Sequence, residues 1–120
     1  MNFLGNVNIF HGRVEKGRAL LGPLALDYPE HAGAEPRPAA GYARPHELDV
    51  ARADTGGGLW ATLETANLAG AIVKLELLDD ERTLLQVEVA REQYDALNPK
   101  IGERLYVRPK RIRVFVDAAS

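Results

Sequence analysis

Strict alternation of apolar and polar residues over positions 71–90 constrains the fold of this chain more than any other feature of its sequence. In the first half, AIVKLELL, the residues that share one face are all apolar: Ala71, Val73, Leu75 and Leu77. In the second half, TLLQVEVA, the matching face carries Leu85, Val87 and Val89. A period of two is typical of strands with one buried face. The polar stretch DDER (79–82) between the halves is typical of a turn, so the sequence predicts a β-hairpin over 71–90.

Weaker patterns of the same kind predict further strands, and only one segment favours a helix. The expected strands cover residues 7–15, 18–22, 40–44, 59–68 and 104–116, the last interrupted at Pro109, where an edge or a break is expected. The expected loops are 28–40 and 53–58, which are rich in Pro and Gly respectively. Residues 91–99 predict one short helix that Pro99 stops. We therefore predict an all-β fold, a small OB-type β-barrel with one short helix.

The length of 120 residues suits one domain, expected over residues 7–116 with a short tail over 117–120. Residues 1–6 are expected to end a linker from an upstream domain, because Phe3 and Leu4 resemble the end of an earlier element. The formal net charge is -2, and there are no cysteines, which excludes disulfides, thiolate metal sites and cysteine nucleophiles. No apolar run approaches the roughly 20 residues of a membrane span, and no signal peptide begins the chain. These features predict a cytoplasmic protein.

The usual catalytic patterns are missing from the sequence. Ser120 is the only serine, and the glycine-rich stretch TGGGLW is not followed by the Lys-Ser/Thr of a phosphate loop. The three histidines, His11, His31 and His46, lie in different segments without metal-ligand spacing. The carboxylates of residues 79–81 fall in the predicted hairpin turn, where we expect them to be solvated. No catalytic, cofactor-binding or metal-binding residue is predicted, and the chain by itself is not expected to be an enzyme.

One short pattern occurs twice: Tyr-x-Arg-Pro in YARPHEL (42–48) and again in YVRPKRI (106–112). A proline restricts the residue before it to extended backbone, so the directions of Arg44 and Arg108 are limited. A guanidinium matches the two oxygens of a planar or tetrahedral oxyanion. We therefore single out four residues as candidates for contact with an anion or a partner subunit: Arg44, His46, Arg108 and Lys110. The alternatives are ordinary outward-facing strand residues, or strand ends punctuated alike by proline rather than a duplicated site.

Several stretches together resemble one known family. FLGNVNIFHGRV (3–14), YARPHELDV (42–50), the hairpin with its helix (70–97) and IGERLYVRPKRIRVFV (101–116) are similar to the C-terminal part of the ATP-binding subunit of bacterial sulfate/thiosulfate importers. That part is a TOBE-like domain, a variant of the OB-type barrel found in MalK-like ABC ATPases. The resemblance spans nearly the whole chain in order, although residues 22–40 match only loosely.

The resemblance implies an accessory domain that contributes to subunit dimerisation and regulation. ATP and Mg would be bound by an ATPase domain upstream of this chain, which would hydrolyse ATP. The implied partners are the identical domain of a second ATPase subunit and, through the upstream domain, the membrane subunits, so the implied location is the inner face of the cell membrane. Related domains of molybdate systems bind oxyanions through a Ser-Ala-Arg-Asn type stretch, which this chain lacks.

Two other functions are alternatives to that one. The first is an oxyanion-sensing module that binds sulfate through Arg44 and Arg108, with His46 or Lys110 in support. The second is a single-strand nucleic-acid-binding barrel, which combines a basic groove with stacked aromatic residues. The negative net charge and an aromatic content of 7% argue against the second, so no nucleic-acid partner is predicted.

Overall fold

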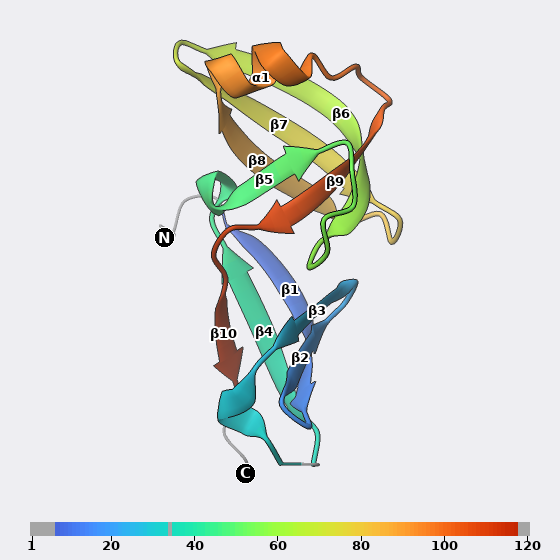
Figure 1. Cartoon of the computed structure of the whole chain (residues 1–120), viewed down its shortest axis with the longest axis vertical. Helices are drawn as coiled ribbons and strands as arrows, with labels where there is room; N and C mark the ends of the chain where they lie inside the picture. The colour runs from blue at the N-terminus through green and yellow to red at the C-terminus, as the bar shows by residue number, and fades with distance from the viewer. Residues whose placement is uncertain (1–6, 34, 118–120) are drawn as a thin grey trace.

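The computed structural model describes residues 7–33 and 35–117, and nearly all of its regular structure is β-strand (Figure 1). The strands are β1 (Asn8–Glu15), β2 (Arg18–Leu21), β3 (Leu24–Asp27), β4 (Arg37–Ala43), β5 (Leu48–Ala51), β6 (Leu59–Ala69), β7 (Ile72–Asp79), β8 (Leu84–Ala90), β9 (Arg104–Pro109) and β10 (Arg113–Val116). Two 3-10 turns, η1 (Pro29–His31) and η2 (Pro45–Glu47), and one α-helix, α1 (Arg91–Leu97), complete the fold. The predicted all-β class with one short helix is confirmed. The predicted linker end, residues 1–6, and residues 118–120 of the predicted tail lie outside the described residues.

The strands form two five-stranded antiparallel sheets that follow one another along the long axis of the molecule (Figure 1). In what we call the first sheet the strand order is β10-β4-β1-β2-β3, and in the second sheet it is β5-β9-β6-β7-β8. Strand β5 therefore leaves the first four strands to join the second sheet, and β10 returns to the first. The chain crosses between the sheets twice, once in each direction.

The two orders correspond strand for strand. If β6, β7, β8 and β9 are matched with β1, β2, β3 and β4, then β10 matches β5, and both sheets have the same neighbours in the same order. Each half of the chain thus builds four strands of one sheet and gives its fifth strand to the other. The sequence showed no repeat beyond the Tyr-x-Arg-Pro pattern, and the two copies of that pattern occupy equivalent places, at the two crossings.

The predicted hairpin over 71–90 is confirmed as β7 and β8. Its cross-strand partners are the apolar residues that alternation placed on one face, with Val73 opposite Val89, Leu75 opposite Val87 and Leu77 opposite Leu85. All six side chains are buried in the core. Alternation therefore fixed both the strands and the face that each one buries.

The hairpin turn differs from its prediction at one residue. Asp79 was expected to be solvated, and this is wrong, because its side chain is only 8% exposed. Its Oδ1 accepts hydrogen bonds from the backbone N–H groups of Glu81 and Thr83 at 2.9 and 2.8 Å. The carboxylate satisfies donors that the turn leaves without partners, so it is part of the turn. The neighbouring Asp80 is exposed, as predicted, and pairs with Arg104 at 2.8 Å.

Two prolines lie near strand ends, Pro109 at the end of β9 and Pro38 near the start of β4. Pro109 ends β9, and the chain resumes as β10 in the other sheet, so the expected interruption of 104–116 is a break. Strand β4 begins at Arg37, within the stretch 28–40 that was predicted to be a loop, and therefore includes Pro38. The backbone of Pro38 faces Asp117, just beyond the end of β10, and the Pro38 carbonyl accepts the Asp117 N–H at 2.9 Å. The missing N–H of proline is tolerated in β4 because β10 has already ended at this position.

The single helix packs on the second sheet. Tyr94 and Leu97 of α1 are partly buried against the core, and the helix ends at Asn98, whose φ of 48° is the left-handed C-cap conformation that asparagine tolerates. This agrees with the short helix predicted over 91–99. None of the described helices is long and apolar enough to span a membrane.

Candidate functional site

Both copies of Tyr-x-Arg-Pro lie at the waist of the molecule, where the chain passes between the sheets. In the first crossing, β4 ends at Ala43 and the chain enters β5 through Arg44 and η2. Pro45 occupies the first position of η2, where its fixed φ suits the turn and its missing N–H costs nothing. The second crossing joins β9 to β10 through residues 110–112. We refer to these two segments, 44–47 and 110–112, as the crossings.

Glu47 holds the two crossings together. Its Oε1 accepts the backbone N–H of Arg44 at 2.9 Å, and its own N–H donates to the Arg44 carbonyl at 2.8 Å, which closes the first crossing. Its carbonyl oxygen accepts the N–H of Lys110 at 2.7 Å, from the second crossing. Its Oε2 lies 3.4 Å from the Arg113 guanidinium at the start of β10. One buried glutamate therefore connects the two crossings with each other and with β10.

The environment of Glu47 lowers its pKa. The hydrogen bond from the Arg44 N–H is the main cause, and the positive charges of Arg113, His46 and Arg111 add to it, while burial opposes the shift. The ionised carboxylate is therefore the form that the fold favours. Sequence reasoning missed this residue. A signal was present in the sequence. Glu47 follows Arg44 by three residues, and at this spacing a glutamate side chain can accept the backbone N–H of the residue that begins a turn.

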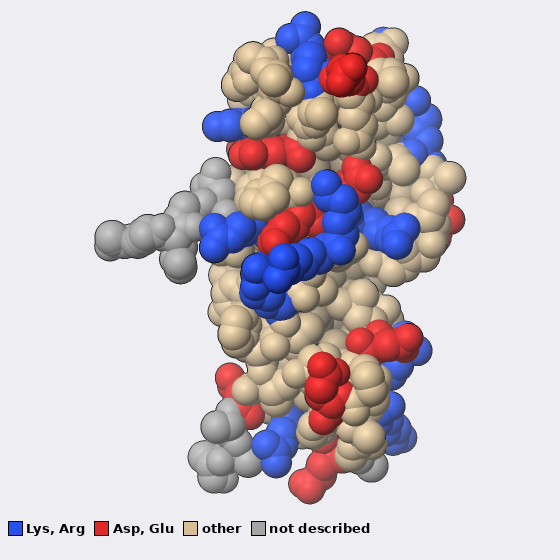
Figure 2. Space-filling view, turned by 60° about the vertical axis from the view of Figure 1, so that its left-hand side comes forward, with Lys and Arg blue, Asp and Glu red and all other residues tan. Residues whose placement is uncertain are grey.

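Basic side chains surround the crossings. Arg44, His46, Arg108, Lys110 and Arg111 are all exposed there. Figure 2 shows Lys and Arg side chains gathered around the middle of this face, with acidic side chains between them. Glu47 bonds the backbone of both Arg44 and Lys110, and His46 and Arg108 are close to these two in sequence, so the four predicted residues lie in one region of the surface.

Arg44 and Arg108, however, line different hollows. Arg44 shares a hollow of about 480 Å³ with Arg113, Tyr42, Phe115 and Val7. The aromatic rings of Tyr42 and Phe115 meet edge to face there, with centroids 5.2 Å apart. No carboxylate lines this hollow among the described residues. It combines two guanidinium groups with an apolar aromatic wall, but one of them, that of Arg113, already has the Glu47 carboxylate 3.4 Å away. The Arg44 guanidinium is therefore the group better placed to bind an anion.

Arg108 lies in the equivalent place of the second sheet, with a different charge balance. It lines a smaller hollow of about 180 Å³ together with Asp49, Tyr106 and Thr55. Asp49 is also its cross-strand partner on β5. A carboxylate beside the guanidinium disfavours a second anion. His46 and Lys110 line neither hollow.

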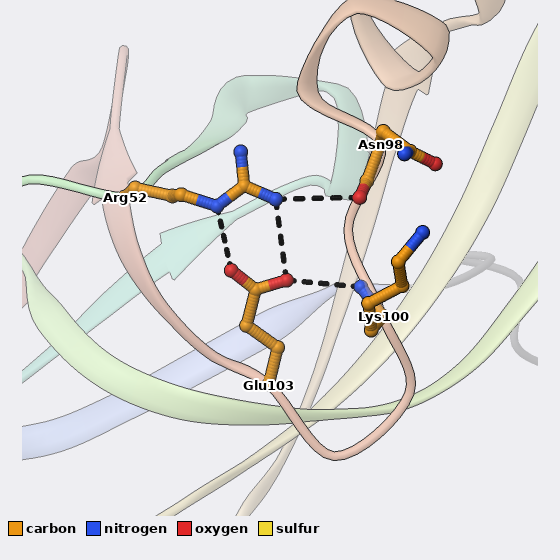
Figure 3. A network of polar contacts seen from close by, with 4 residues as sticks. All are labelled: Arg52, Asn98, Lys100 and Glu103. Atoms are coloured by element: carbon orange, nitrogen blue, oxygen red, sulfur yellow. Dashed lines mark hydrogen bonds and ion pairs between the residues drawn. The ribbon is translucent and has the colours of Figure 1, made fainter.

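A second polar network, which the sequence did not indicate, ties the segment after β5 to the loop before β9 (Figure 3). The Arg52 Nε donates to Glu103 at 2.6 Å, and its Nη2 donates to the Asn98 carbonyl at 3.3 Å. The same Glu103 accepts the backbone N–H of Lys100 at 2.9 Å. The Arg52 guanidinium and this N–H lower the pKa of Glu103. Because these polar groups bond one another, the network links the segment after β5 to the loop before β9 and stabilises this end of the second sheet.

The described residues hold no cluster of three or more His, Asp or Glu side chains placed to bind a metal ion. The glycine-rich stretch at residues 55–60 runs into a strand and not into a helix, because Leu59 and Trp60 begin β6.

Comparison with known proteins gives the family. The profile of the CysA C-terminal regulatory domain matches residues 8–50, and that of the TOBE-like domain matches residues 53–110. The sulfate/thiosulfate import ATP-binding protein CysA of Bacillus cereus is 37% identical over 117 residues, which cover 96% of this chain and 33% of the relative. The corresponding protein CysA 2 of Shewanella oneidensis is 34% identical over 95% of this chain and 32% of its own length. That of Bordetella pertussis is 38% identical over 94% and 32%.

The chain belongs to the CysA C-terminal regulatory family. The resemblance drawn from the sequence motifs is thereby confirmed. The chain spans about a third of the length of these CysA relatives, at 32–33% of each. The first profile ends within β5 and the second begins shortly after it, so the two family profiles meet near the boundary between the two halves of the fold.

A solved structure shares the fold of this CysA-type domain. The cytoplasmic molybdate-binding protein ModG, in a form with molybdate bound, aligns with a TM-score of 0.74 and 18% sequence identity. The alignment covers 98% of this chain and 100% of the ModG chain. At this identity the likeness concerns the fold alone, and it confirms the predicted OB-type, TOBE-like class.

Proposed function

We propose that this chain is the C-terminal accessory domain of an ABC importer's ATP-binding subunit, that it contributes to dimerisation and regulation of that subunit, and that the importer carries sulfate or thiosulfate. The observation that carries the proposal is the continuous similarity to sulfate/thiosulfate import ATP-binding proteins over 94–96% of this chain. The partner of the domain is the identical domain of a second subunit. The membrane subunits are contacted through the rest of the protein, which places the assembly at the inner face of the cell membrane.

The ATP chemistry belongs to another part of such a subunit. The sequence of 120 residues has no glycine-rich loop followed by Lys-Ser/Thr, so the chain does not offer the residues that hold ATP and Mg²⁺. The role proposed for this chain is to bring two ATP-binding subunits together and to transmit regulatory signals to them. The chain itself is not proposed to be an enzyme.

A chimera tests this function. The C-terminal third of the Bacillus cereus relative is replaced by this chain, and uptake of radiolabelled sulfate is measured in cells that lack their own sulfate-import ATP-binding protein. We expect the chimera to restore uptake and a truncated relative without this region to restore less. A chimera produced at the normal level that imports no more sulfate than the truncated protein would show that the chain does not serve this role.

A second candidate is sulfate sensing, because Arg44 and Arg113 both line one hollow, with Glu47 beside Arg113 at 3.4 Å. Sulfate would accept charge-assisted hydrogen bonds from Arg44 and Arg113. Titration with millimolar sulfate, followed by amide chemical shifts, should then move signals around Arg44 and Arg113. The variant Arg44→Ala should abolish the response and Arg108→Ala should leave it intact, since Arg108 lies beside Asp49. An equal response in both variants would exclude this site.

A further inference from the structure

Among the described residues the outer edge of β10 has no paired strand, whereas the equivalent edge in the second sheet, that of β5, lies near β8. In the second sheet the edge strands β5 and β8 approach each other, and β8 also contacts η2. The Asn8 side chain bonds both the N–H and the carbonyl of Gln86 at 2.8 Å, and so occupies the edge of β8. Within residues 7–33 and 35–117, no strand pairs with the outer edge of β10, which Figure 1 shows at the margin of the first sheet. Natural proteins usually protect such an edge.

The backbone groups that face this open edge are those of Val114 and Val116. The Asp117 N–H donates to the Pro38 carbonyl at 2.9 Å, so the backbone of Asp117 points toward β4. Because backbone direction alternates along a strand, Phe115 also points toward β4, and Val114 and Val116 point outward. Two N–H groups and two carbonyls are therefore available to another strand. β10 contains neither proline nor lysine, two residues that often protect an exposed strand edge from pairing.

Space lies alongside this edge. A groove of about 660 Å³ separates β10 from the segment of β3 and η1, and its lining includes Leu26 and Tyr28 on one side and Val114 on the other. These three side chains are partly buried against the core. A strand added along β10 would therefore gain main-chain hydrogen bonds and cover apolar surface.

The sequence of β10 is complementary to itself. If a second copy pairs antiparallel about Phe115, Val114 of one chain faces Val116 of the other, and the two pairs exchange four main-chain hydrogen bonds. Arg113, which also lies 3.4 Å from Glu47 of its own chain, then faces Asp117 of the second chain, twice. The two Phe115 side chains, each 57% exposed, meet at the two-fold axis in a non-hydrogen-bonded pair, where side chains approach most closely. The exposed side chains of Arg113, Phe115 and Asp117 share one face of β10.

We propose that β10 pairs antiparallel with β10 of a second copy of this chain, in register about Phe115. This interface rests on the proposed function, because it is the contact through which the domain would bring two ATP-binding subunits together. An isologous contact of this kind closes the assembly at two copies. Because β10 has only 4 residues, we expect a weak dimer of the isolated chain, and stronger pairing of whole subunits, whose other contacts would raise the effective concentration.

Disulfide trapping tests the register. The chain has no cysteine, so Phe115→Cys introduces a single thiol at a position where paired strands bring Cβ atoms within reach of a disulfide. The matched control is Leu68→Cys, which replaces a 50% exposed side chain near the end of β6 in the other sheet. Under mild oxidation at equal concentration, Phe115→Cys should form covalent dimers at least about tenfold faster than Leu68→Cys, because the paired strand raises the local thiol concentration. Equal rates would overturn the proposal.

Charge reversal tests the same register by another route. Asp117→Arg in the Phe115→Cys background places like charges opposite each other and should slow trapping to the rate of the control. Adding Arg113→Asp restores opposite charges and should restore the rate, provided that thermal denaturation shows the variant to be folded. If Asp117→Arg leaves the rate unchanged, the register is wrong. Fast trapping with a failed sulfate-uptake chimera would keep this interface and reject the proposed function, and slow trapping with a working chimera would do the reverse.

Discussion

Asn8 connects the two sheets, and its substitution gives the most quantitative test of the fold. Its side chain is 5% exposed. The amide nitrogen donates to the carbonyls of Ala43 at 3.1 Å and Gln86 at 2.8 Å, and the amide oxygen accepts the N–H of Gln86 at 2.8 Å. The residue lies in β1, yet Gln86 lies in β8, so these bonds fasten the edge of the second sheet to the start of the first.

The cost of Asn8→Ala follows from these three bonds. A hydrogen bond contributes about 1 kcal/mol net, and a buried donor or acceptor left without a partner costs about 1 to 3 kcal/mol. Gln86 is only half-buried, so water can reach part of what the truncation exposes. We therefore expect a loss of about 2 to 4 kcal/mol in the free energy of unfolding. For a domain of this size the midpoint of thermal unfolding should fall by roughly 4 °C per kcal/mol.

Urea denaturation followed by circular dichroism measures this loss. The matched control is Asn67→Ala, an exposed asparagine in β6 that should change the stability by less than about 0.5 kcal/mol. Asn8→Asp sharpens the test, because it keeps the acceptor for Gln86 N–H but turns a carboxylate oxygen toward two carbonyls. Its deficit relative to the native chain should shrink as the pH falls and the carboxyl is protonated. A native-like stability of Asn8→Ala would refute the reasoning.

Three further predictions concern the turn, the crossings and a close strand contact. Asp79→Ala should cost about 1 to 3 kcal/mol because it removes the acceptor for two turn N–H groups, whereas the exposed Asp80→Ala should leave the urea midpoint nearly unchanged. Because the pKa of Glu47 is lowered, its carboxylate stabilises the fold at neutral pH and loses this effect below about pH 4.3, so the stability difference between the native chain and Glu47→Gln should shrink on acidification. Gly12→Ala places a Cβ 1.9 Å from a backbone oxygen of β2 and should abolish soluble expression, unlike Gly33→Ala, which meets nothing within 4 Å.

Local patterns were sufficient for much of the fold. The hairpin over 71–90 and the break at Pro109 follow from residues that are neighbours in sequence, because alternation and proline act on the chain around them. The pairing of β10 with β4 does not follow in this way. It joins residues such as Phe115 and Ala40, and nothing in either strand specifies the other as its partner. The exchange of strands between the sheets is therefore decided by tertiary packing.

Buried polar residues were the hardest part of the site to foresee. Asn8 reaches a partner 78 residues away, and a lone asparagine in a predicted strand gives no sign of it. Glu47 differs, because its bond to Arg44 is local and the spacing of the two residues favours it. Its contact with Arg113, 66 residues later, was not accessible from sequence. The predicted arginines were brought to the same waist, but into separate hollows.

Both Arg-Pro pairs lie where the chain passes from one sheet to the other, which gives the repeat a structural role. Pro45 begins the turn of the first crossing, and Pro109 ends β9 immediately before the second crossing. The two arginines differ in their charged neighbours. Arg108 has Asp49 as its cross-strand neighbour, whereas Arg44 lies with Arg113 and no carboxylate lines their hollow among the described residues. Arg113 itself has Glu47 3.4 Å away, so we propose Arg44, just after β4 of the first sheet, as the residue more available for recognition of an anion. If both proposals hold, the Arg113 guanidinium would be shared between Glu47, an anion in the hollow and Asp117 of a second copy. Two ligands that draw on one group oppose each other reciprocally, so an anion held at Arg113 would weaken pairing of β10, and pairing would weaken the anion's affinity by the same factor.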